Sequence, residues 1–235
     1  GVVGLKPSRN RLSHGRYLNL LPINIVVDGV VSRTVRDTAA FYAEAERYFT
    51  NPALAAIGHV TGSAETRWRI GVSVAHPAGG NCNREVAAAV EKVAECCARQ
   101  GHHVETFAPF PDMSQMMDDF LLYWARMAAM LKYLGYPLTG RGFDRQQLEP
   151  LTHHLSQHYV SNGWRSPGAI RRLRNYGKRY EALLQRYDLL LTPVLASPPC
   201  KLGELALDLD KETAFERLRQ YTPFTPNSNI SGTPA

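Results

Sequence analysis

Apolar and polar residues alternate most clearly between residues 69 and 107. Arg69–Val74 is a short apolar run, which predicts a buried strand. Asn83–Arg99 has helical spacing and ends at Gln100-Gly101, which predicts a helix and its C-terminal stop. His102–Phe107 returns to an extended pattern. The expected inward positions of the helix are Val86, Ala89, Val90, Val93 and Ala94. Because such a crossover favours parallel strands and a right-handed connection, the sequence predicts an α/β fold.

Helical spacing recurs on both sides of this unit. A helix is predicted from about Thr34 to Tyr48, with Ser32 or Thr34 as its N-cap. Three further helices are predicted, over Met113–Leu134, Arg145–Ser161 and Ser166–Arg186. The opening residues up to Asp28 are rich in Gly, Pro, Asn and Arg, so irregular chain is expected there.

A second buried strand is predicted late in the chain. Tyr187–Val194 is apolar and stops at Pro193, and a loop containing Pro198-Pro199 follows it. A loop after a buried strand is a natural pocket wall. The fold class expected is therefore α/β.

Length and composition are those of a globular protein. The 235 residues are 44% hydrophobic and 20% charged, which is enough to bury a core in one domain or one large lobe. No apolar run approaches the roughly 20 residues that cross a bilayer. Cys82, Cys96, Cys97 and Cys200 form no Cys-x-x-Cys pair, so reduced thiols in a cytoplasmic protein are expected.

The formal net charge of +6 is concentrated in one stretch. Cations recur from Arg165 to Arg186, interleaved with Leu and Tyr at helical spacing. A solvated helix face explains them better than nucleic-acid binding, because no nucleic-acid motif accompanies them.

Self-contained catalytic motifs are absent from the sequence: it has no Gly-x-Ser-x-Gly, His-Glu-x-x-His, Walker loop or Gly-x-Gly-x-x-Gly. His154 and His158 lie one helical turn apart, but surface histidines are favoured over a metal site. The run Gly79–Asn83 can present amides to an anion, although a loop capped by Asn83 is favoured. Cys82 has only the helix start to activate it as a nucleophile.

Several ordered segments resemble the amidase-signature family. Gly1–Ser8, followed by Arg11-Leu12-Ser13, resembles the stretch after that family's nucleophile, and Val30–Ala39 resembles its next segment. Four later matches follow in family order, at Trp68–Ser73 with Gly101–Glu105, Tyr187–Pro193, Thr222–Thr225 and Asn229–Ala235. The sequence of Leu21–Gly29 resembles amidases of the nylon-oligomer hydrolase type more closely than it resembles the glutamyl-tRNA amidotransferase subunit.

The resemblance implies an α/β fold with a mixed sheet core flanked by helices. It also implies amide hydrolysis by a serine nucleophile, a second serine on a cis peptide and a proton-relaying lysine. The family uses no metal and no organic cofactor. These three side chains are expected before Gly1, so Lys6 is expected to be structural. Residues 1–235 are expected to be a partial amidase domain, incomplete at both ends and inactive alone.

By position in the family, six residues are expected near the acyl pocket: Met127, Leu131, Pro193, Val194, Phe224 and Asn229. The apolar stripe that holds Met127 and Leu131 is core packing first and a pocket lining second. A small-molecule amide is the expected substrate, and neither membrane nor nucleic acid is an expected partner. A helix-rich exposed face is compatible with a homodimer of the complete protein.

Two alternatives stay open on the sequence. The chain can belong to a non-catalytic relative or subunit that uses the fold as a scaffold. It can also belong to a subunit that transfers ammonia onto acylated tRNA, for which the basic stretch near Arg171 would serve as a contact.

Overall fold

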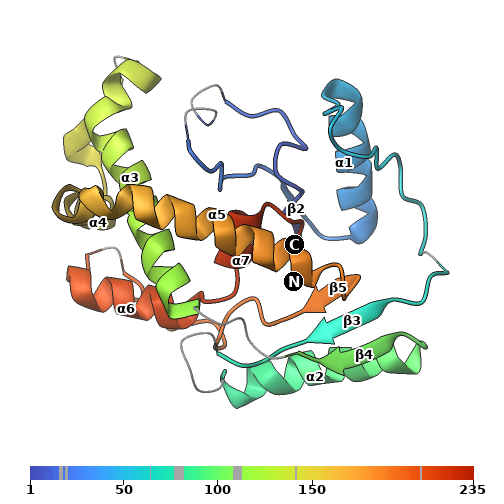
Figure 1. The fold of residues 1–235 in the computed structure, drawn as a ribbon. Helices are drawn as coiled ribbons and strands as arrows, with labels where there is room; N and C mark the ends of the chain where they lie inside the picture. Colours follow the sequence, from blue (N-terminus) through green and yellow to red (C-terminus); the bar gives the residue numbers. More distant parts are fainter. Residues whose placement is uncertain are drawn as a thin grey trace. The chain divides into compact units, whose positions relative to one another are not determined.

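The chain forms two compact units (Figure 1). The computed structural model describes residues 1–15, 18, 21–63, 65–76, 82–107, 113–140, 142–206 and 208–235. One unit comprises Gly1–Thr66 with Ser228–Ala235, and the other comprises Arg67–Asn227. No helix among the described residues combines the length and apolar character needed to cross a membrane.

The first unit contains a short antiparallel ribbon and a helix. Strands β1 (Val3–Leu5) and β2 (Val30–Ser32) pair with Gly4 opposite Val31. Helix α1 (Val35–Tyr48) begins as predicted, because the Thr34 hydroxyl accepts a hydrogen bond of 3.1 Å from the Asp37 amide. The Tyr42 hydroxyl donates to the Leu5 carbonyl, which joins the helix to the ribbon.

Arg9 connects segments of this unit that are far apart in sequence. Its guanidinium donates to the carbonyls of Asn24 at 2.7 Å, Asn229 at 2.9 Å and Ile230 at 2.7 Å. The last two carbonyls belong to helix α7 (Pro226–Ser231). Gly232 follows with φ +87°, and a Cβ there would lie 2.9 Å from Arg9 Cζ, so glycine is required on both counts.

The second unit is built on a parallel sheet, as the sequence predicts. Its strand order is β4 (His103–Thr106), β3 (Arg69–Val72) and β5 (Leu189–Leu191), all parallel. The α/β class is therefore confirmed, with a parallel sheet in this unit and an antiparallel ribbon in the other.

Helix α2 (Arg84–Arg99) packs on this sheet with a narrower face than predicted. Asn83 caps it, and Val90 packs with Ala94 and Cys97 against the strands. The inward assignment of Ala89 and Val93 is wrong, because both are exposed. Ala94 and Cys97 come four and seven residues after Val90, so these three side chains lie on one stripe of the helix. Ala89 and Val93 lie to the side of that stripe.

Helices make up the rest of the second unit. They are α3 (Met113–Thr139), α4 (Pro150–Asn162), α5 (Ser166–Leu183) and α6 (Lys211–Tyr221), with short 3-10 turns η2 (Arg145–Gln147) and η3 (Gly163–Arg165). The predicted helix over Arg145–Ser161 is interrupted because Pro150 starts a new helix, a position that proline favours. In Figure 1, α5 crosses α3, against which it packs.

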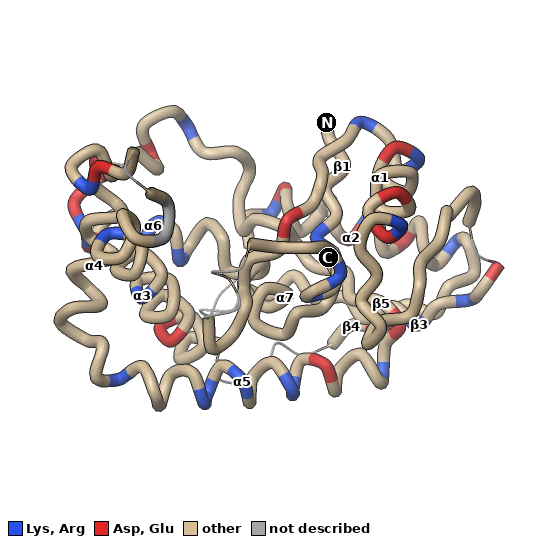
Figure 2. Tube along the Cα trace, turned by 90° about the horizontal axis from the view of Figure 1, so that it is seen from above, with Lys and Arg blue, Asp and Glu red and all other residues tan. Residues whose placement is uncertain are grey.

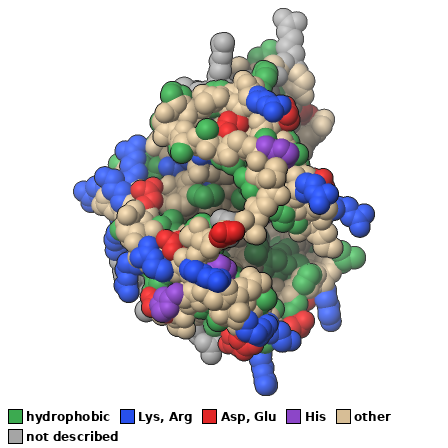
Figure 3. Space-filling model, turned by 90° about the vertical axis from the view of Figure 1, so that its right-hand side faces the viewer, with side chains coloured by type: hydrophobic (Ala, Val, Ile, Leu, Met, Phe, Trp, Pro, Cys, Tyr) green, Lys and Arg blue, Asp and Glu red, His purple; other side chains and the backbone are tan. Residues whose placement is uncertain are grey.

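Helix α5 presents its cations to solvent. Leu173, Tyr176 and Tyr180 are buried, as predicted, while Arg171 and Lys178 are exposed. Lys and Arg recur along α5 in Figure 2, and in Figure 3 such side chains extend outward from the surface. The exposure matches the predicted solvated helix face.

Candidate functional site

A cavity of about 540 Å³ lies where strands β3 and β5 end. We call it the sheet-end cavity. It is lined by residues of four segments: the chain after β3, the start of α2, the loop after β5 and helix α6. Among the lining side chains are His76, Asn83, Ser197, Cys200, Glu204 and Glu216. In open α/β sheets, ligands bind in the crevice beyond the carboxyl ends of the strands, and this cavity has that location.

Backbone hydrogen bonds hold the walls of the sheet-end cavity together. The Asn83 amide donates to the Ala196 carbonyl at 2.8 Å, and the Ala196 amide donates to the Tyr221 carbonyl at 3.0 Å. His76 is buried, with Nε2 3.2 Å from the Gln220 carbonyl oxygen. The loop after β5 is therefore fixed to the start of α2 and to the end of α6.

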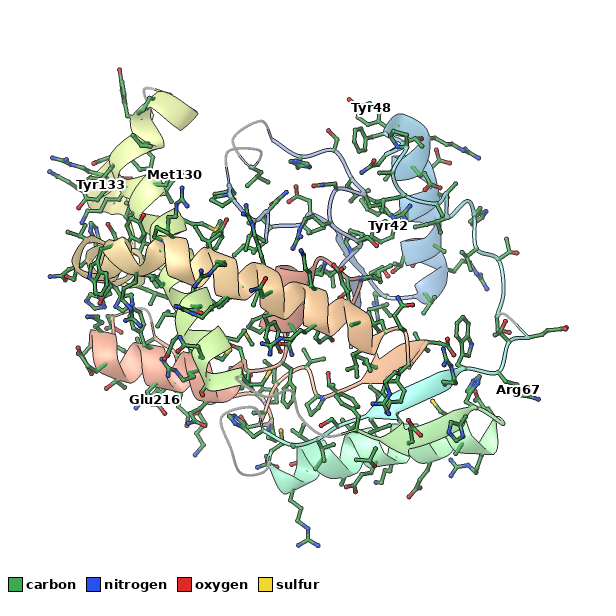
Figure 4. All side chains as sticks on the ribbon, in the orientation of Figure 1. Tyr42, Tyr48, Arg67, Met130, Tyr133 and Glu216 are labelled. Atoms are coloured by element: carbon green, nitrogen blue, oxygen red, sulfur yellow. The ribbon has the colours of Figure 1, made fainter. Side chains whose placement is uncertain are left out.

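The acidic side chains of this cavity accept hydrogen bonds from neighbouring protein groups. Glu216, which projects from α6 (Figure 4), accepts from Gln220 Nε2 at 2.9 Å. Glu204 accepts from the Lys201 amide at 3.1 Å. In the part of the chain that the structure describes, no lysine donates a hydrogen bond to a serine hydroxyl. The lining can position a polar substrate, but it lacks an assembled serine and lysine pair.

A second cavity, of about 490 Å³, lies between α3 and α5. We call it the helix-pair cavity. Its polar wall is an ion pair in which Arg172 Nε and Nη2 each donate to a different oxygen of Asp119 at 2.7 Å. Asp119 is only 2% exposed, and Gln115 also donates to it at 3.3 Å. The hydrogen bond to Asp119 raises the pKa of Arg172 further above its already high value, so the guanidinium stays charged.

Tyr176 extends the same contact inward. Its hydroxyl donates to Asn227 Oδ1 at 2.9 Å and lies 2.7 Å from Met113 Sδ. Burial, followed by the neighbouring Tyr180, raises the pKa of Tyr176 well above the usual tyrosine range. The neutral hydroxyl thus connects α5 to the start of α3 and to Asn227 in the first turn of α7.

Three of the predicted pocket residues lie near the end of β5. Pro193 is buried, and Val194 is 70% exposed. Phe224 packs with Cys82 and Ala196, and Ala196 lines the sheet-end cavity. Phe224 is therefore beside that cavity, and the assignment of all three to a substrate pocket stays a prediction.

The other three predicted residues lie elsewhere. Met127 and Leu131 share one stripe of α3, half-buried and 38% exposed respectively, and neither lines the two cavities. Asn229 belongs to the first unit, where its side-chain amide donates to the Ile25 carbonyl at 2.9 Å. Their role in substrate binding also stays a prediction.

Cys82 and His158 have ordinary structural environments. His154 is half-buried rather than on the surface as expected, and its Nδ1 is buried without a hydrogen-bond partner among the described residues. Burial raises the pKa of Cys82, which disfavours the reactive thiolate. Gly79, Gly80 and Asn81 of the neighbouring glycine-rich run lie outside the described residues. His158 packs edge-on against Phe215. Its pKa is lowered first by burial and then by Lys211 and Arg165. Within the described ranges, no group of three or more His, Cys, Asp or Glu is arranged to hold a metal ion.

The sequence placed a pocket wall in the loop after the second buried strand, and Ala196, Ser197 and Cys200 of that loop line the sheet-end cavity. Asp119 was not singled out from the sequence, and Arg172 was included in the predicted solvated face of α5. A single acid on a predicted buried face was the available signal, because it requires a partner. Helix α6, which carries Glu216, was not predicted. Asp210 was the available sequence signal, because Asp is a preferred N-cap residue. In the structure it caps α6 by accepting a hydrogen bond of 2.9 Å from the Thr213 amide.

Known proteins match the chain over its whole length. The sequence profile of the Amidase family matches residues 1–235. The provisionally named amidase AmiC of Mycobacterium leprae is 43% identical over 235 residues, which are all of this chain and 50% of that protein. The 6-aminohexanoate-cyclic-dimer hydrolase of Paenarthrobacter ureafaciens is 29% identical over 255 aligned residues, covering 100% of this chain and 51% of that protein.

A solved structure also matches the chain over its whole length. The structure of 6-aminohexanoate cyclic dimer hydrolase complexed with substrate superposes with a TM-score of 0.80 and 25% identity, covering 100% of this chain and 52% of that chain. The chain thus spans about half the length of the curated relatives it matches. This neighbour agrees with the nylon-oligomer hydrolase resemblance of the sequence.

The Arg172–Asp119 pair gives a stability prediction. Arg172→Leu leaves a buried carboxylate without its cation and should lower the free energy of unfolding by about 3 kcal/mol. Arg171→Leu removes a solvated charge from the same helix and should change it by less than about 0.5 kcal/mol. Urea unfolding measures both.

The double variant Asp119→Leu with Arg172→Leu removes both charges, so it should be more stable than Arg172→Leu alone. If Arg172→Leu is no more destabilising than Arg171→Leu, the pair has no structural role.

Proposed function

The chain belongs to the amidase family, and we propose that it forms part of an enzyme that hydrolyses the carbon–nitrogen bond of small-molecule amides. The observation that carries the proposal is the family match over all 235 residues. The sheet-end cavity supports it, because it supplies a polar crevice at the carboxyl ends of parallel strands.

The proposed chemistry is acyl transfer to water. A serine oxygen attacks the amide carbon as its proton passes through a second serine to a neutral lysine, and backbone amides stabilise the oxyanion of the tetrahedral intermediate. The carbon–nitrogen bond then breaks as the lysine returns this proton through the second serine to the departing amine. Water attacks the acyl-serine, a water proton returns to the serine oxygen, and the carboxylic acid is released.

These catalytic side chains are proposed to lie in sequence outside these 235 residues. Two observations support this: the chain spans half of its relatives, and the described residues contain no lysine bonded to a serine. The role proposed for residues 1–235 is to form walls of the substrate pocket. A cytoplasmic location and a homodimeric state also stay predictions.

Amine release by the full-length polypeptide that contains these residues tests the activity. We expect it to hydrolyse at least one member of a panel of linear aliphatic, aryl and cyclic amides, and we expect residues 1–235 alone to hydrolyse none. Absence of turnover by the full-length protein across the panel would instead favour the non-catalytic scaffold.

Val194 allows the pocket assignment to be tested without disturbing the core. It is 70% exposed, so Val194→Ala should leave stability unchanged while altering kcat/KM for one amide class by up to about tenfold relative to another. Val160→Ala is a matched control, because that valine is 64% exposed on α4. An identical substrate profile for wild type and Val194→Ala would remove Val194 from the pocket.

A further inference from the structure

The acidic side chains of the sheet-end cavity come from two different segments. Glu204 belongs to the loop after β5, and Glu216 belongs to α6. Arg217, the next residue of α6, donates from Nη1 to the Glu204 backbone carbonyl at 2.7 Å. This hydrogen bond holds the loop against the helix, so both carboxylates border the same space.

Neither carboxylate is paired with a cation. Glu216 accepts from the side-chain amide of Gln220, and Glu204 accepts from the Lys201 backbone amide. Among the residues that the structure describes, no salt bridge reaches either glutamate. The Arg217 guanidinium also lines the cavity, but it donates to a carbonyl. Because an ionised carboxylate has about four acceptor positions, each glutamate can still accept hydrogen bonds from a ligand.

Much of the remaining lining is apolar or uncharged. Leu205 and Tyr221 are half-buried walls, and Ser197 adds a hydroxyl. Asn83 Oδ1 already accepts from the Glu85 amide at 2.9 Å, so its side-chain NH2 is available as a donor. A cavity of about 540 Å³ with such walls has room for an amide, a short hydrocarbon chain and a charged end.

The two carboxylates favour one kind of charged end. An ammonium group has three donors and no acceptor, so it can donate to both glutamates. A carboxylate at the same place would meet like charges. A methyl group there would displace water from the carboxylates without replacing the hydrogen bonds.

We propose that the sheet-end cavity selects amides that carry an ammonium group, which Glu204 and Glu216 bind while the hydrocarbon part lies on Leu205 and Tyr221. This inference rests on the proposed function, because it names the class of amide that the pocket receives. Both glutamates act as specificity-determining residues, and the bond-breaking groups are separate from them.

Calorimetric titration of the full-length protein with butylammonium chloride tests the cation site without any need for hydrolysis. Saturable binding with a Kd at or below about 5 mM is expected. 1-Butanol should bind at least about fivefold more weakly, because a neutral hydroxyl makes a weaker hydrogen bond to a carboxylate. Butyrate, which has the opposite charge, should not bind.

Variants of α6 separate a specific contact from the general negative field. Glu216→Gln keeps the side-chain shape and should weaken butylammonium binding about tenfold, and Glu204→Gln should have a similar effect. Glu212→Gln removes the same charge one turn earlier on α6, at an exposed residue that does not line the cavity. It should weaken binding less than twofold.

Two anilides of the same length test the consequence for catalysis by the full-length protein. 3-Aminopropananilide carries an ammonium group where butananilide carries a methyl group. We expect kcat/KM to be at least about tenfold higher for the ammonium anilide, and Glu216→Gln should lower this ratio about tenfold. Glu212→Gln should leave the ratio unchanged.

The outcomes distinguish this inference from the proposed function. Equal kcat/KM for the two anilides, butyrate binding as tight as that of butylammonium, or equal effects of Glu216→Gln and Glu212→Gln would each overturn the cation site. Hydrolysis of the anilides would still support the proposed function in those cases. Saturable butylammonium binding that Glu216→Gln weakens, with no hydrolysis of any amide, would support the cation site and contradict the proposed function.

Discussion

A buried carboxylate on α3 constrains the arrangement of the larger unit. Asp119 is removed from water, and an ionised group in that position is tolerated only with a well-aligned partner. Arg172 provides that partner through two hydrogen bonds of 2.7 Å, which fixes α5 against α3. Tyr176 lies one turn further along α5 and is thereby directed toward Met113 and Asn227. The helix-pair cavity exists because this contact holds the two helices in one register.

Elements with strong periodicity could be predicted from the sequence. The strand–helix–strand unit, α1 and α5 all had several apolar positions in phase, and they form close to the expected bounds. Cap residues also marked the starts of α1 and α2. Strands β1 and β2 have three residues each, which is too short for a period to be recognised. They form because tertiary contacts, such as Tyr42 with Leu5, hold them together.

The candidate site was less predictable than the fold for a physical reason. A cavity is made by residues of several elements, and their meeting depends on tertiary packing. Phe224 was placed in a pocket by family position, and the structure puts it against Ala196 at the sheet-end cavity. Asp119 and Arg172 are 53 residues apart, and no local pattern indicates that they meet. Ala89 and Val93 show the same limit, since helical spacing alone did not fix which stripe of α2 faces the sheet.

Locating the nucleophile shows whether these residues build pocket walls for an amidase whose catalytic serine lies outside them. The full-length protein would be treated with a serine-reactive fluorophosphonate and digested, and the labelled peptide would be identified by mass spectrometry. We expect the labelled serine to lie outside residues 1–235. A label within them, such as on Ser197 in the sheet-end cavity, would contradict it.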